Sequence, residues 1–185
     1  KGLAVLVVPV ITMRLMAEER RSGTLEMLIT LPVKDSDVIL GKFLGAFGLV
    51  LVLLAGSISY PLFMFKFPWS LGPLDMGPVW SCYVGLFLYS AAAVSVGLLV
   101  SSLTESQAVS FFVTFMVLLA FGFSGDVADN FSGAVAGVIN YVSFQARMNG
   151  FMRGLIDTRD VIFFLSITVL SLMISFRALE RRKWA

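Results

Sequence analysis

The side chains that could take part in chemistry are charged residues gathered in two short stretches of the sequence. Residues 14–42 contain a run of acids and bases from Glu18 to Arg21, and residues 153–160 mix aspartates with arginines. Mixed charges at this spacing form ion pairs and polar contact surfaces. The first stretch suits a segment that lies at the membrane surface or against a partner, and the second could form an external gate or an interfacial anchor.

The residue inventory excludes several functional classes. The sequence has no histidine, which rules out HExxH zinc sites, Ser-His-Asp triads and histidine proton relays. Cys82 is the one cysteine, so neither an internal disulfide nor a thiolate metal cluster can form. Gly41-Lys42 lacks the upstream glycine of a phosphate-binding loop, so this sequence does not bind ATP in that way. A net charge of +2 is too small to indicate nucleic acid as a partner.

The composition indicates an integral membrane protein. Of the 185 residues, 58% are hydrophobic and 14% are charged, whereas soluble domains carry about 25% charged residues. A soluble monomer would expose large apolar areas, and a disordered chain would need low hydrophobicity with high net charge. We therefore predict an all-α, polytopic membrane helical bundle, in which about 20 apolar residues form each span.

Charge-free runs divide the single transmembrane domain, residues 1–185, into segments. We predict four spans, at residues 43–65, 79–100, 106–125 and 161–179. Residues 1–13 are too short to cross alone and read as the end of a truncated span. Residues 14–42 form a cytoplasmic segment, and residues 126–160 form an external loop with short helices. Because the count of crossings is odd and the sequence opens on Lys1, we expect a first helix to be missing.

Basic residues set the expected orientation. Lysines and arginines are concentrated in residues 14–42 and in the C-terminal tail, which five crossings place on the same side as the loop 101–106. The positive-inside rule places that side in the cytoplasm. We expect a multi-pass protein of the cytoplasmic (inner) membrane, surrounded by lipid.

Within residues 14–42 the pattern predicts a short amphipathic helix. Apolar residues 25–31 follow Gly23, which permits a sharp change of direction, and Thr24, which can cap a helix. Pro32 ends the helix. From periodicity alone, an interfacial helix without a partner stays a possible alternative.

The stretch MRLMAEERRSGTLEMLITLPVKDSDVILGKFLGA resembles the signature region of ABC-2 type transporter permeases. It is most similar to the gliding-motility-type (Gld-like) and copper-maturation-type (NosY-like) branch. The matching positions are Glu18, Glu19, Arg20, Gly23, Thr24, Glu26, Leu28, Pro32, Gly41 and Lys42. Leu31 departs from the serine that is common before the proline. Residues 153–166 and 179–184 resemble the last span and basic tail of the family.

The resemblance implies a six-helix, type V exporter-like permease with both ends in the cytoplasm. It implies pairing with a second permease copy or a paralogue, and an ABC ATPase subunit that holds ATP and Mg. Transport would follow alternating access, driven by that ATPase. The residues expected to couple to it are Glu18, Glu19, Arg20, Arg21, Gly23, Thr24, Glu26, Leu28, Pro32 and Glu105.

Two further sets are candidates for the transport route. Apolar aromatic residues within the spans could line a path for a lipid-like substrate, or could be packing residues: Tyr60, Phe111, Phe112 and Phe115. Charged residues at the mouth of the last span could form an external gate: Arg153, Asp157, Arg159 and Asp160.

Two rival functions differ in class. An intramembrane enzyme would need a nucleophile or a metal set, and the sequence has no histidine and no paired acids within the predicted spans. We therefore expect no catalysis by this chain. A non-transporting scaffold or anchor subunit remains the alternative, and a neighbouring gene for an ATPase would favour the transporter.

Overall fold

The computed structural model describes residues 2–23, 35–66, 75–128 and 133–181, and this part of the chain is helical without strands. The helices, in chain order, are α1 Gly2–Thr12, α2 Ala17–Arg21, α4 Asp35–Ser57, α5 Ser59–Lys66, α6 Met76–Leu103, α7 Gln107–Ala128, α8 Ala134–Val142, α9 Phe144–Met152 and α10 Thr158–Glu180. The predicted all-α class is confirmed.

Four stretches of helix are long and apolar enough to cross a membrane: Ser36–Pro61, Met76–Leu103, Gln107–Gly125 and Thr158–Glu180. They correspond in order to the four predicted spans. α6 and α10 begin before the predicted spans 79–100 and 161–179, and a polar residue caps the start of each. Asp75 accepts a hydrogen bond from the Gly77 amide at the start of α6, and Asp157 does the same for the Arg159 amide at the start of α10.

The first long span is interrupted near its end. α4 stops at Ser57, and α5 resumes at Ser59. Pro61 has no N–H to donate to the preceding turn. Since that N–H would have joined residue 61 to residue 57, the interruption falls at Ile58, one turn before Pro61.

α6 is the central helix of the bundle. In its most apolar window 78% of the residues are buried, against 28% for α4 and 17% each for α7 and α10. Its buried side chains are mostly small, including Ala91, Ala92 and Ala93. Small residues allow neighbouring helices to approach closely. A Cβ at Gly97 would lie 2.3 Å from Thr12 Oγ1 of α1, and one at Gly85 would lie 2.7 Å from Phe151 of α9.

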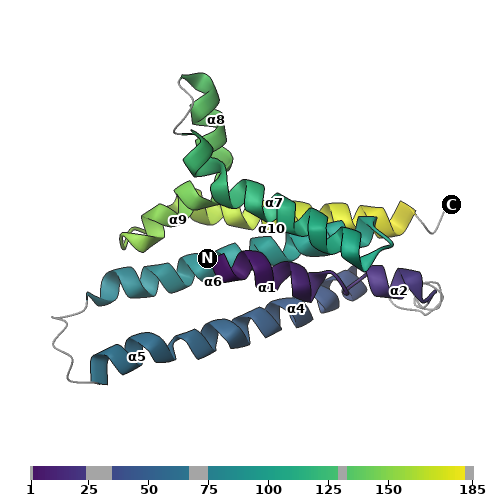
Figure 1. Cartoon of the computed structure of the whole chain (residues 1–185), viewed down its shortest axis with the longest axis horizontal. Coiled ribbons are helices and arrows are strands. Elements are labelled where there is room, and N and C mark those ends of the chain that lie inside the picture. Colours follow the sequence, from purple (N-terminus) through teal and green to yellow (C-terminus); the bar gives the residue numbers. More distant parts are fainter. Residues whose placement is uncertain (1, 24–34, 67–74, 129–132, 182–185) are drawn as a thin grey trace.

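The bundle has two distinct ends (Figure 1). At one, which we call the α2 end, lie α2, the start of α4, the turn between α6 and α7, and the end of α10. At the other, the α9 end, lie α5, the start of α6, α8 and α9. The segments predicted to share one side of the membrane therefore lie at the α2 end, as far as the structure describes them.

An aromatic cluster fixes α9 against the long helices. Phe144, the first residue of α9, is fully buried and stacks on Phe121 of α7 at 4.9 Å between ring centroids. It also meets Tyr89 of α6 edge-on at 5.5 Å and Phe164 of α10 at 5.4 Å. Ser143 caps α9 by accepting a hydrogen bond from Ala146 N. α8 and α9 are both too short to cross a bilayer.

Candidate coupling site

The corner between α1 and α2 is held by a serine from the central helix. Ser101 Oγ of α6 accepts hydrogen bonds from the backbone amides of Met16 and Ala17, each at 3.1 Å. The same oxygen lies 3.4 Å from the Met13 carbonyl oxygen, to which it donates. Met16, Ala17 and Ser101 are all buried. One side chain of α6 thus satisfies three backbone groups that the break between the helices leaves unpaired.

A lysine from α4 binds the same corner from another side. Lys42 Nζ donates to the Leu15 carbonyl oxygen at 2.5 Å and lies 2.5 Å from Glu19 Oε1 of α2. The lysine side chain is 16% exposed, so water screens this ion pair only in part. Segment 13–19 is therefore attached both to α4 and to α6.

Glu19 pairs with Lys42, and the other predicted coupling residues divide into three groups. Glu18 and Arg21 point from α2 with exposed side chains, and Gly23 follows with φ of +72°, a left-handed conformation that favours glycine. Glu105 lies in the turn between α6 and α7, at the same end of the bundle. The remaining positions lie outside the described residues, or have side chains outside them: Arg20, Thr24, Glu26, Leu28 and Pro32.

At the α9 end, the ion pair that the structure shows joins only one of the four predicted gate residues, Asp160, to an arginine outside that set. Asp160 Oδ1 accepts a hydrogen bond from Arg147 Nη1 of α9 at 2.8 Å, and both side chains are largely buried. The guanidinium of Arg147 also covers the rings of Tyr141 and Phe163, at 4.6 and 5.1 Å from their centroids. Arg147 lay outside the four residues predicted as a gate.

The other three predicted gate residues have local roles or are exposed. Asp157 caps α10, and Arg153 donates its backbone amide to the last carbonyls of α9. Among the described residues no ion pair joins Arg153 or Arg159 to an acid. The geometry therefore fixes α9 to α10 through Arg147 and Asp160 rather than through the expected set.

The structure does not bring the predicted substrate-path residues together. Tyr60 is 74% exposed on α5, at the α9 end. Phe111, Phe112 and Phe115 lie in the first half of α7, which starts at the α2 end. The three phenylalanines do contact each other, because Phe111 stacks on Phe115 and meets Phe112 edge-on.

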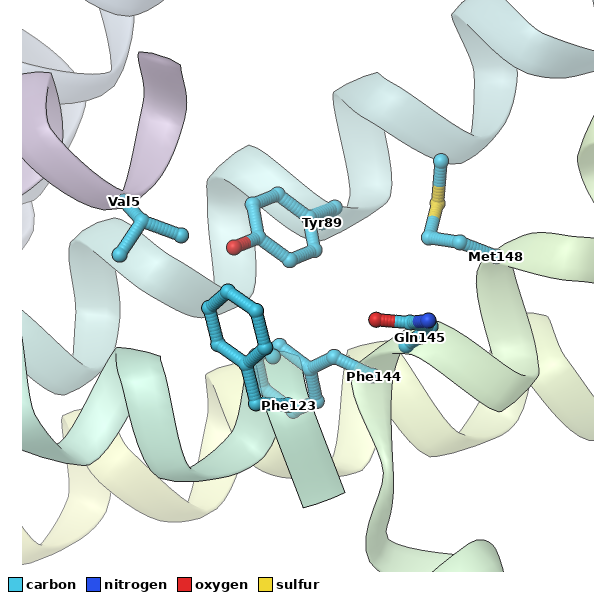
Figure 2. Close-up of a pocket in the computed structure, with 7 residues that line it drawn as sticks. Val5, Tyr89, Phe123, Phe144, Gln145 and Met148 are labelled. Carbon is cyan, nitrogen blue, oxygen red and sulfur yellow. The ribbon is translucent and has the colours of Figure 1, made fainter. Parts of the chain in front are cut away.

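Several hollows lie elsewhere in the described part of the bundle, and two of them adjoin α6. A pocket of about 190 Å³ lies between α1, α6, α7 and α9, where the Tyr89 hydroxyl points toward Val5 and the ring of Phe123 lies nearby (Figure 2). A larger groove of about 810 Å³ runs between α6, α7 and α10. We call the latter the α10 groove. Sequence reasoning had identified neither.

Polar groups inside the bundle are mostly satisfied by their own helices. Ser95, Thr168 and Ser175 each donate to a carbonyl three or four residues earlier. Ser110 and Thr114 are buried hydroxyls on α7 that have no hydrogen-bond partner among the residues that the structure describes. In the described part of the chain, no group of three or more acids or cysteines could hold a metal ion.

The sequence alone did not indicate the contacts of Ser101 and Arg147, because these contacts depend on how the helices pack. Ser101 is one of several serines in α6, and Arg147 is one of several arginines in the 126–160 segment. The available signal was that Arg147 is the single charged residue of α9, since such a charge needs a partner when its helix is packed.

Comparison with known proteins gives one match. The family model described as ABC-2 family transporter protein matches residues 3–176, nearly the whole chain. No curated protein and no solved structure gives a significant match. The long apolar helices, together with this match, lead to one conclusion: the chain belongs to the ABC-2 transporter family, as a multi-pass membrane permease component of the ABC transporter type.

Proposed function

We propose that this chain is a permease subunit that moves substrate across or out of the membrane by alternating access, driven by a separate ATPase subunit. The observation that carries the proposal is the attachment of segment 13–19 to two spanning helices, in a chain that belongs to the ABC-2 family. ATP and Mg would be held by the ATPase, and two permease copies, or this chain and a paralogue, would form the route.

The attachment supplies a physical path for coupling. An ATPase docked at residues 18–32 would move α2 when its two nucleotide-binding subunits close. Lys42 would pass that displacement to α4, and Ser101 would pass it to α6. Because α6 is the buried centre of the bundle, its movement would shift the helices packed around it.

The exposed side chains at the same end suit a docking role. Glu18 and Arg21 present opposite charges on the surface of α2, and Glu105 lies in the neighbouring turn between α6 and α7. An interface rim of mixed charge fixes orientation and partner choice more than affinity. We place the protein in the cytoplasmic (inner) membrane, with the α2 end in the cytoplasm, and assign it to the Gld-like/NosY-like branch.

The test uses the reconstituted transporter with its co-purified ATPase. Deletion of Glu26 and the substitution Leu28→Asp should each reduce the ATPase activity that depends on the permease, with membrane insertion intact. Glu180→Gln, at the α2 end but on α10, is the control and should retain coupling. Full coupling in both altered proteins, or failure of any ATPase to co-purify, would contradict the proposal.

A further inference from the structure

The α10 groove has walls that suit a hydrocarbon chain. Val96 and Val100 of α6, Phe121 of α7 and Leu170 of α10 are among the residues that line it. Its volume of about 810 Å³ falls within the range of about 300–1,000 Å³ that is usual for sites of small ligands. Leu170 is 59% exposed, so the groove is open on the outer side of the bundle.

The charged part of the groove lies at one end and is positive. Arg147 and Arg159, at the α9 end, line it, and no acidic side chain of the described residues does. Arg147 is already held by Asp160 and by the Tyr141 carbonyl oxygen. Arg159 is exposed in the first turn of α10 and makes no ion pair with the described part of the chain. The charge available to a ligand is therefore that of Arg159.

The rest of the groove offers few hydrogen-bonding groups to a ligand, because most of the other lining side chains are apolar. The hydroxyl of Ser166, halfway along α10, donates to the Ile162 carbonyl oxygen of its own helix. Its capacity as a donor is thus used within α10. A ligand with one anionic group and a long apolar chain would match the distribution of polarity along the groove.

We propose that the α10 groove binds an anionic phospholipid of the surrounding bilayer, with its phosphate at Arg159 and one acyl chain along α10. Anionic headgroups are attracted to arginines near the membrane surface, at about 1 kcal/mol per residue. Arg147 is held in place by Asp160 and by the rings of Tyr141 and Phe163, and its positive charge would lie below the headgroup. Binding of this lipid requires no ATPase, so the proposal stands independently of the transport function.

The experiment measures retention of phosphatidylglycerol and phosphatidylcholine by the purified chain, using native mass spectrometry from nanodiscs of both lipids. The unaltered protein should prefer phosphatidylglycerol. Arg159→Gln should lower this preference about fivefold, the equivalent of one arginine contact, and Arg159→Lys should restore most of it. Ser166→Trp, which fills the groove, should reduce binding of phosphatidylglycerol while leaving Arg159 in place.

Arg153→Gln is the matched control, because Arg153 is also exposed at the α9 end and does not line the groove. An equal loss in Arg153→Gln and Arg159→Gln would show general surface attraction and would overturn the proposal. Unchanged retention in Ser166→Trp would do the same. Efficient disulfide cross-linking of Ser166→Cys between two copies, in a Cys82→Ala background, would identify the groove as a contact between copies instead.

Discussion

Lys42 Nζ of α4 lies 2.5 Å from Glu19 Oε1 of α2, which ties the segment that precedes the proposed docking region to the first long span. Lys42→Ala removes this ion pair and the hydrogen bond to the Leu15 carbonyl oxygen. We expect the free energy of unfolding to fall by about 2 kcal/mol, as for charged hydrogen bonds. Thermal unfolding in detergent measures this change.

A charge reversal tests whether the pair itself matters. Glu19→Lys combined with Lys42→Glu should recover part of the stability that either single change loses, since the opposite charges face each other again. Arg14→Ala, an exposed arginine in the same segment, is the control and should change stability by less than about 0.5 kcal/mol. No recovery in the double variant would contradict a direct pairing.

Ser101→Ala should weaken the corner between α1 and α2. The substitution leaves the buried amides of Met16 and Ala17 without their acceptor, which costs about 1–3 kcal/mol. Ser95→Ala is a matched control, because Ser95 lies in the same helix and bonds only to the Ala92 carbonyl oxygen. Hydrogen exchange of residues 13–17 should accelerate in Ser101→Ala and stay unchanged in Ser95→Ala.

Gly97→Ala should force α1 away from α6. The added Cβ would lie 2.3 Å from Thr12 Oγ1 and 2.7 Å from Thr12 Cβ, so the helices must separate. Overpacking of this kind costs about 1–3 kcal/mol. Gly48→Ala, in α4, meets nothing within 4 Å and should be neutral or slightly stabilising. Equal unfolding temperatures for the two variants would argue against the close packing of α1.

Asp160→Asn should destabilise the α9 end much more than Asp157→Asn. Loss of the Asp160 charge leaves Arg147 largely buried without its counter-charge, at a cost of about 3 kcal/mol. Asp157 only caps α10, and asparagine is as good a cap, so its replacement should cost a few tenths of a kcal/mol. Protease sensitivity of residues 144–156 compares the two variants.

The spans could be predicted from the sequence because a bilayer requires about 20 residues for each crossing and disfavours charged side chains within them. The extent to which each span is buried could not be predicted in the same way. α6, α7 and α10 have nearly equal hydropathy, but only α6 is buried on most sides. The informative signal was size: Ala91–Ala93, Gly85 and Gly97 lie in α6.

The partners of individual charges were less predictable. Arg147 and Asp160 come together because Phe144 seats α9 between α7 and α10, which is a tertiary event. The nearest arginines in sequence, Arg153 and Arg159, were the natural choice for a gate, but helix geometry directs them elsewhere. The docking residues from Thr24 to Pro32 stay a prediction.

The hydrogen bonds that the Met16 and Ala17 amides donate to Ser101 Oγ also fix an order of events during synthesis. The corner after α1 can take its final form only once the ribosome has made residue 101 and the second long span, α6, has been delivered into the membrane. Until then its amides must find temporary acceptors, such as water or headgroups. The beginning of the described chain is therefore completed late in assembly, by the helix around which the other spans collect.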